Sequence, residues 1–133
     1  IEITETVMMT DMENRINILN NFKKDGFIVE MDDFGSGYSS LNMLKDMPVD
    51  VLKIDMGFLR HSRNSLKSEK ILRNIINLSD NIGIKSLAEG VETDVQFRLL
   101  SDMGCNMFQG YYFSKPIPLN EFEELCFNSR NIA

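Results

Sequence analysis

Histidine and cysteine, the usual protein ligands of zinc, are scarce in this chain of 133 residues, which has one histidine and two cysteines. Cys105 and Cys126 form neither a CxxC pair nor a disulfide framework, so we expect a reducing cytoplasm. His61 lies in a polar stretch and is expected on the surface. The sequence shows no apolar run long enough to span a membrane and no signal peptide.

Positive charge is also in short supply, because 14 lysines and arginines face 20 aspartates and glutamates and leave a formal net charge of −6. A protein that binds the phosphate backbone of DNA or RNA needs an excess of cations, so we expect neither as a partner. With 43% hydrophobic residues the chain can form the core of one domain. It begins at Ile1, already in a strand-like "IEIT", and we therefore expect a piece of a longer protein.

Strand and helix patterns alternate along the sequence. The β-rich runs are Ile1–Thr4, Ile28–Asp32, Val51–Asp55, Lys85–Ala88 and Met107–Gln109. Helix patterns lie between and after them: one with apolar residues from Met12 to Phe22 that stops at Gly26, a short one over 40–46, one that ends at Gly83, one from Thr93 to Gly104, and one from about Asn120. Repeated βα units predict one α/β domain with a parallel sheet and helices outside it.

The stretch "VEMDDFGSGYSS", residues 29–40, places two carboxylates side by side after an apolar run. Asp32 and Asp33 repel each other unless a cation lies between them. Aspartate and glycine are also common in solvated turns, so this stretch alone leaves a turn and a metal or phosphate site equally open.

Polar side chains lie within or just after every predicted strand, and we expect them at the edge where parallel strands of such folds carry their ligand sites. They are Glu2 and Glu5, Asp32 and Asp33, Lys53 and Asp55, Glu89 and Glu92, and Gln109. Carboxylate oxygens in this number suit hard divalent cations such as Mg²⁺ or Mn²⁺ rather than zinc. A bound cation would also remove the repulsion between the paired carboxylates.

Five segments in this order resemble the motifs of the EAL-domain cyclic di-GMP phosphodiesterases. They are "EITET" (2–6), "DDFGSGYSSL" (32–41), "KID" (53–55), "AEGVET" (88–93) and "QGYYFSKP" (109–116). The resemblance implies a TIM-like (β/α) barrel that holds two divalent ions, Mg²⁺ or Mn²⁺. It also implies hydrolysis of one phosphodiester of cyclic di-GMP, a bacterial second messenger, to give the linear dinucleotide.

The resemblance also implies a role for each matching residue. Glu2 and Asp32 would be metal ligands, and Asp33 would bind the second ion. Lys53 would contact the attacking water and the phosphate, and Glu89 resembles the catalytic glutamate near the metals.

Further residues would support this centre and the substrate. Those assigned to the rim or to contacts behind the ligands are Gln109, Asp55, Glu5 and Glu92. The loop tied to substrate binding and dimerisation comprises Phe34, Gly35, Ser36, Gly37, Tyr38, Ser39 and Ser40. Ser36 replaces the commoner threonine and keeps the hydroxyl group, and a homo-oligomer is expected.

One departure from the family pattern limits the expected activity. The Glu-Ala-Leu motif and the asparagine ligand that follows it are absent, and "SLAEG" at 86–90 belongs to the later motif. A complete barrel has eight strands, whereas five are predicted here. We therefore expect residues 1–133 to be the C-terminal part of an EAL domain, a partial barrel of about five βα units that is inactive by itself.

Two alternatives differ in class from a hydrolase. A flavodoxin-like receiver domain also has five βα units, but its acidic pair follows the first strand, whereas here it follows the second. A degenerate EAL domain would bind cyclic di-GMP or a protein without cleaving it, and the decisive ligands lie upstream of Ile1. Either form of EAL domain is compatible with GGDEF or sensory domains in the parent protein, and with a membrane anchor on them.

Overall fold

The computed structural model describes residues 1–4, 11–32, 34, 41–57 and 65–130, in which strands and helices alternate. The strands are β1 Glu2–Thr4, β2 Glu30–Asp32, β3 Val51–Asp55, β4 Lys85–Glu89 and β5 Met107–Gln109. The helices are α1 Met12–Lys24, α2 Leu41–Asp46, α4 Ser65–Asn81, α5 Asp94–Asp102 and α6 Leu119–Arg130. Each strand and helix expected from the sequence is present, with ends that differ by a few residues.

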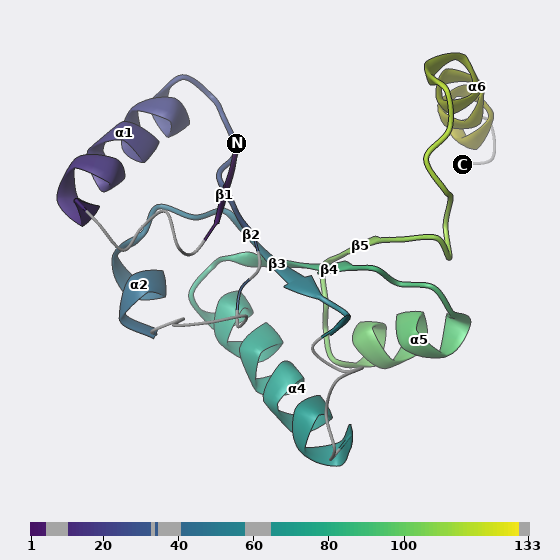
Figure 1. The fold of residues 1–133 in the computed structure, drawn as a ribbon, viewed down its shortest axis with the longest axis horizontal. Coiled ribbons are helices and arrows are strands. Elements are labelled where there is room, and N and C mark those ends of the chain that lie inside the picture. The colour runs from purple at the N-terminus through teal and green to yellow at the C-terminus, as the bar shows by residue number, and fades with distance from the viewer. Residues whose placement is uncertain (5–10, 33, 35–40, 58–64, 131–133) are drawn as a thin grey trace.

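The strands form one parallel sheet in the order β1-β2-β3-β4-β5. Helices α1, α2, α4 and α5 lie in an arc around it, and α6 stands apart at the end of an extended segment that follows β5 (Figure 1). The predicted α/β fold with a parallel sheet is confirmed. Among the described residues, no helix is long and apolar enough to cross a membrane.

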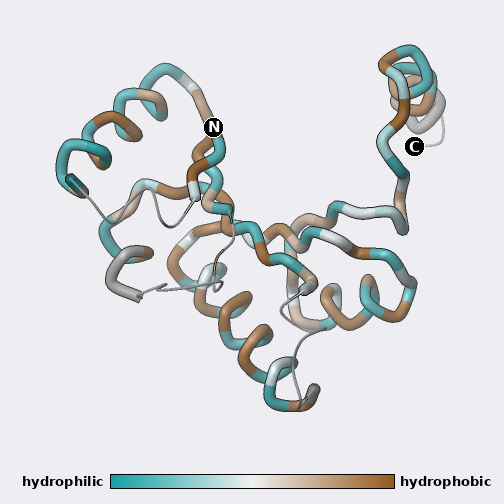
Figure 2. The backbone as a smooth tube through the Cα atoms, viewed as in Figure 1, coloured by the Kyte–Doolittle hydropathy of each residue, from teal (hydrophilic) through white to brown (hydrophobic). Residues whose placement is uncertain are grey.

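The hydrophobic core lies between the sheet and these helices, in two clusters. The first joins α1 and α2 to the outer side of β2 and β3, through buried residues Leu19, Val29, Met31, Leu44, Met47, Val49, Leu52 and Ile84. The second joins α4 and α5 to β3 and β4, through Ile54, Met56, Leu72, Ile76, Ala88, Val91, Leu100, Met103 and Cys105. Hydrophobic residues recur among hydrophilic ones along α4 and α5 (Figure 2), as expected of helices with one buried face.

The α5 helix begins as its sequence predicts. The Thr93 hydroxyl accepts the Gln96 N–H at 3.2 Å, and the Gln96 side-chain oxygen accepts the Thr93 N–H at 3.0 Å, which completes a capping box. The helix ends before Gly104, whose φ of +88° is a conformation that glycine adopts without strain.

Strand β2 is shorter than the sequence predicts, because it begins at Glu30 and not at Ile28. The backbone of Val29 bonds mainly to Asp50, the residue before β3, although its carbonyl also accepts the Val51 N–H at 3.2 Å. Its N–H donates to the Asp50 carboxylate at 2.9 Å, and its carbonyl accepts the Asp50 N–H at 2.8 Å. Ile28 is left 59% exposed.

Candidate metal centre

Lys53 is the central side chain of the site. It lies in the middle of β3, between Leu52 and Ile54, which point outward into the two core clusters. Because side chains alternate along a strand, Lys53 points to the opposite, inner face of the sheet. Only 7% of the residue is exposed, and a lysine buried to this extent needs charged partners.

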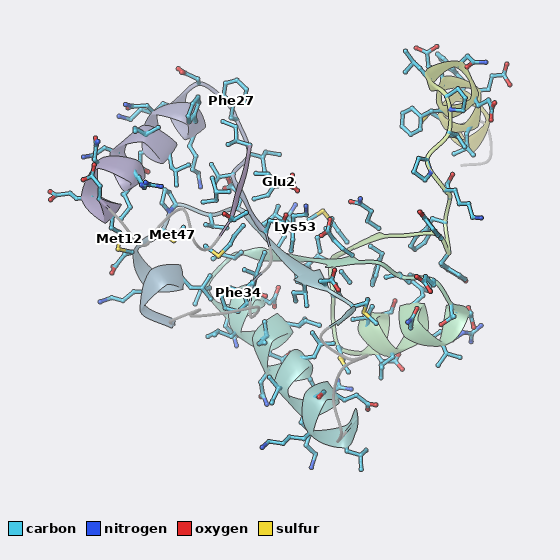
Figure 3. All side chains as sticks on the ribbon, in the orientation of Figure 1. Glu2, Met12, Phe27, Phe34, Met47 and Lys53 are labelled. Carbon is cyan, nitrogen blue, oxygen red and sulfur yellow. The ribbon has the colours of Figure 1, made fainter. Side chains whose placement is uncertain are left out.

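Three carboxylates from three other strands supply those partners. The Lys53 Nζ lies 2.9 Å from Glu89 Oε1 and 3.4 Å from Asp32 Oδ1, and it also forms an ion pair with Glu2. In Figure 3 the labelled Glu2, on the edge strand β1, lies near the labelled Lys53, on the central strand β3. One oxygen from each of the three carboxylates lies within 4.8 Å of the others.

Glu2 reaches this cluster from an unexpected place, because it is the first residue of β1 and not at the carboxyl end of that strand. Glu2 pairs in register with Glu30, two residues before Asp32. Asp32 and Glu89, by contrast, are the last residues of β2 and β4. The cluster therefore runs diagonally across the strands, as expected where strands are tilted and staggered around a barrel axis.

The charges of the cluster fit a divalent cation. Three carboxylates and one ammonium group give a net charge of −2, and the three attractive pairs with Lys53 are matched by three repulsive pairs among the carboxylates. A cation of charge +2 among these oxygens would neutralise the group. Oxygen donors suit Mg²⁺ or Mn²⁺, so the residues present fit the predicted ion type.

Other residues predicted for the site lie around it without joining this cluster. The Asp55 carboxylate accepts the Gly57 N–H, just beyond β3. Gln109 is exposed at the end of β5, and the Glu92 N–H donates to the Gln96 side chain at 2.8 Å. Phe34 is half-buried and packs against the first core cluster. Glu5, Asp33, Gly35, Ser36, Gly37, Tyr38, Ser39 and Ser40 lie outside the described residues.

A backbone crossing beside the site was not foreseen from the sequence. Gly110 follows β5 and lies directly against the backbone of Val91, which follows β4. Gly90 and Gly110 each come directly after a polar residue that ends a strand, in "EGV" and "QGY". A glycine in that place often marks a close approach of two backbone segments, and this signal could have revealed the crossing.

The chain matches the EAL domain family model over residues 1–116. The cyclic di-GMP phosphodiesterase NbdA of Pseudomonas aeruginosa is 38% identical over 124 residues, which are 93% of this chain and 16% of that protein. The chain thus spans about a sixth of the length of this curated relative.

Two solved structures have the same fold. The EAL domain of Mycobacterium smegmatis DcpA matches with a TM-score of 0.83 and 41% identity, over 93% of this chain and 56% of that chain. A manganese and cyclic di-GMP complex of Klebsiella pneumoniae BlrP1 matches with a TM-score of 0.77 and 33% identity, over 86% of this chain and 29% of that chain. The five parallel βα units therefore correspond to part of a TIM-like EAL barrel.

Proposed function

Because the chain belongs to the EAL domain family, we propose that the protein containing it is a metal-dependent phosphodiesterase that hydrolyses cyclic di-GMP to the linear dinucleotide. The observation that carries this proposal is the convergence of Glu2, Asp32 and Glu89 on Lys53. An acidic site attracts a phosphodiester only if cations reverse its charge, and this cluster has the charge and donor atoms to hold one.

Among the described residues, Glu2, Asp32 and Glu89 would hold a divalent ion. Asp33, which lies outside the described residues, would bind a second ion. When bound, paired ions stabilise the attacking and leaving oxygens of an in-line displacement and lower the pKa of a bound water. Lys53 would direct its ammonium group toward the phosphate and the attacking water, and would stabilise the charge that develops on the phosphoryl oxygens.

The remaining predicted residues would support the site from its edge. Those proposed to orient the ligands and the substrate are Asp55, Gln109, Glu5 and Glu92, together with the loop 34–40, which would also contribute to a dimer. We expect cyclic di-GMP as the partner, cytoplasmic placement of this domain, and GGDEF or sensory domains elsewhere in the protein.

A product assay on the full-length protein tests this proposal. We expect linear dinucleotide with Mg²⁺ or Mn²⁺, and little with Ca²⁺, which is larger and accepts irregular coordination that suits a tight two-ion site poorly. Glu89→Gln keeps the size of the side chain but removes the charge, and should abolish turnover. Tight binding of cyclic di-GMP without any product over hours, with Mg²⁺ present, would favour a domain that binds but does not cleave.

A further inference from the structure

We propose that Gly110 is a positioning residue for Glu89. The missing side chain of Gly110 lets the segment after β5 cross the segment after β4 in direct backbone contact, and this contact fixes Glu89 against Lys53. The inference rests on the proposed function, since it gives Gly110 a role toward the same site.

The crossing is held by hydrogen bonds on both sides of Gly110. The Val91 N–H donates to the Gln109 carbonyl at 3.1 Å, and the Tyr112 N–H donates to the Val91 carbonyl at 3.0 Å. Val91 is fully buried in the second core cluster. The backbone of Val91 is therefore clamped between the residues that precede and follow Gly110.

No other residue type fits at position 110. A Cβ atom there would lie 2.1 Å from the Val91 carbonyl oxygen and 2.4 Å from the Val91 nitrogen, where real Cβ atoms essentially never approach within 3.0 Å. The φ angle of +155° at Gly110 adds strain for any L side chain. Because the obstructing atoms belong to the backbone, the whole Val91 segment would have to move.

Movement of Val91 reaches Glu89 through the single residue between them, Gly90. Glu89 is otherwise held from the β3 side, where its carbonyl accepts the Met56 N–H at 3.0 Å. Glu89 also pairs in register with Asp55 of β3 and with Gln109 of β5. A displacement of about 1 Å near reacting groups costs about 10²-fold in rate, so a shift of this size at Val91 is enough to disturb the cluster.

Gly110→Ala in the full-length protein tests the inference, with Gly104→Ala as the matched control. Gly104 also has a positive φ, +88°, and follows α5 in the connection between β4 and β5, but a Cβ atom there meets nothing within 4 Å. Both variants should lose stability. Only Gly110→Ala should also weaken Mn²⁺ binding by at least about tenfold in calorimetry, and lower kcat by about 10²-fold with KM nearly unchanged.

Equal Mn²⁺ affinity and equal kcat in the two variants would overturn the inference. If Gly110→Ala does not fold, Gly90→Ala replaces it, because Gly90 has a φ of +72° and its Cβ atom would meet only Met56 Cβ at 3.8 Å. That variant should weaken Mn²⁺ binding more than Gly104→Ala does, and equal affinities would again overturn the inference.

The Mn²⁺ titration also separates this inference from the proposed function. A wild-type protein that binds Mn²⁺ but never linearises cyclic di-GMP overturns the proposed function, while weaker binding by Gly110→Ala still supports the positioning role. A wild type that turns over while both variants bind Mn²⁺ equally overturns the positioning role alone. A wild type that binds no Mn²⁺ overturns both.

Discussion

At the scale of single residues, Lys53 is the side chain on which the proposed site depends most. A buried ammonium group with three carboxylates around it can serve the fold, the chemistry or both. Removal of the lysine distinguishes a structural role from a catalytic one. A bound divalent ion can replace the positive charge of Lys53 among the carboxylates, but it cannot replace the contact of Lys53 with a phosphate.

We predict that Lys53→Ala in the full-length protein lowers turnover of cyclic di-GMP by about 10²–10³-fold, the range found when one charge-stabilising donor is removed. With Mg²⁺ present, the unfolding temperature should change little, because the ion compensates the carboxylates. Lys85→Ala is the control, since Lys85 is exposed at the opposite end of β4 from Glu89. Retained turnover, or marked loss of thermal stability even with Mg²⁺, would show that Lys53 is structural.

Asp94, at the start of α5, should make the stability of the fold depend on pH, although it lies outside the site. Its hydrogen bonds to Arg98 and to the Tyr112 hydroxyl, at 2.6 and 3.0 Å, hold the pKa of the Asp94 carboxyl below its usual value of 3.8. Because the folded-state pKa is lowered, this stabilisation is present above pH 3.8 and is lost as pH falls through the folded pKa. Thermal unfolding of wild type and Asp94→Asn should differ at neutral pH and converge in acid, and a constant difference would contradict this.

The same hydrogen bond acts in the opposite direction on its donor. Bonding to Asp94 raises the pKa of the Tyr112 hydroxyl above 10.0, so its stabilisation is present below pH 10 and is lost as pH rises through the higher folded value. Tyr112→Phe removes the donor and keeps the ring, which stacks on Phe97 with centroids 5.6 Å apart. In thermal unfolding above pH 10, wild type should therefore lose this stabilisation, whereas Tyr112→Phe should show no such loss.

At the scale of helices and strands, the capping box of α5 gives the clearest prediction. Gln96→Ala removes the acceptor of both the Glu92 and the Thr93 N–H groups and should cost about 1 kcal/mol of unfolding free energy. Gln96→Glu keeps an acceptor at the same position and is the matched control. Chemical denaturation measures both variants, and equal stability of Gln96→Ala and wild type would show that the box does not stabilise the fold.

The elements were predictable from the sequence where local chemistry decides them. Thr93 and Gln96 specify their capping box by spacing alone, and Gly83 and Gly104 follow the ends of α4 and α5. The start of β2 was not predictable, because Asp50, 21 residues away, competes for the N–H of Val29.

The site was predictable in its members but not in its geometry. Spacing places Lys53 and Asp55 on one face of β3, yet Lys53 joins the carboxylate cluster while the Asp55 carboxylate bonds to the nearby Gly57 N–H. The diagonal position of Glu2 depends on the stagger between strands, and the Gly110 crossing depends on two loops that are 19 residues apart. Neither the stagger of the strands nor the contact between the two loops is encoded in a local sequence pattern.

At the scale of the whole molecule, the described part of the sheet has two open edges. In it, β1 and β5 each pair with one neighbouring strand only. Large apolar side chains are exposed near these edges and on α6, which lies apart in Figure 1: Ile1, Phe22, Phe27 and Ile28, and Leu119, Phe122 and Leu125. Unpaired strand edges and exposed apolar groups both favour association.

We therefore predict that the 133-residue chain taken alone self-associates. We also predict that it has no phosphodiesterase activity, because its sequence lacks the Glu-Ala-Leu motif and the asparagine ligand. Burial of apolar surface is worth roughly 25 cal/mol per Å², so a few hundred Å² on each copy is enough to drive association. Light scattering at several concentrations, with a product assay on the same samples, measures both properties. A monomer at all concentrations would contradict the role of the exposed edges, and turnover would show that the chain contains all the ligands it needs.

Whether Glu2, Asp32 and Glu89 bind a divalent ion can be tested directly by soaking crystals of the full-length protein in Mn²⁺ and locating the ion by its anomalous scattering. We expect an anomalous peak at coordination distance, about 2–2.6 Å, from carboxylate oxygens of Glu2, Asp32 and Glu89, beside the Lys53 ammonium group. Mn²⁺ bound only elsewhere, with these three carboxylates still paired to Lys53 and no ion among them, would contradict this expectation.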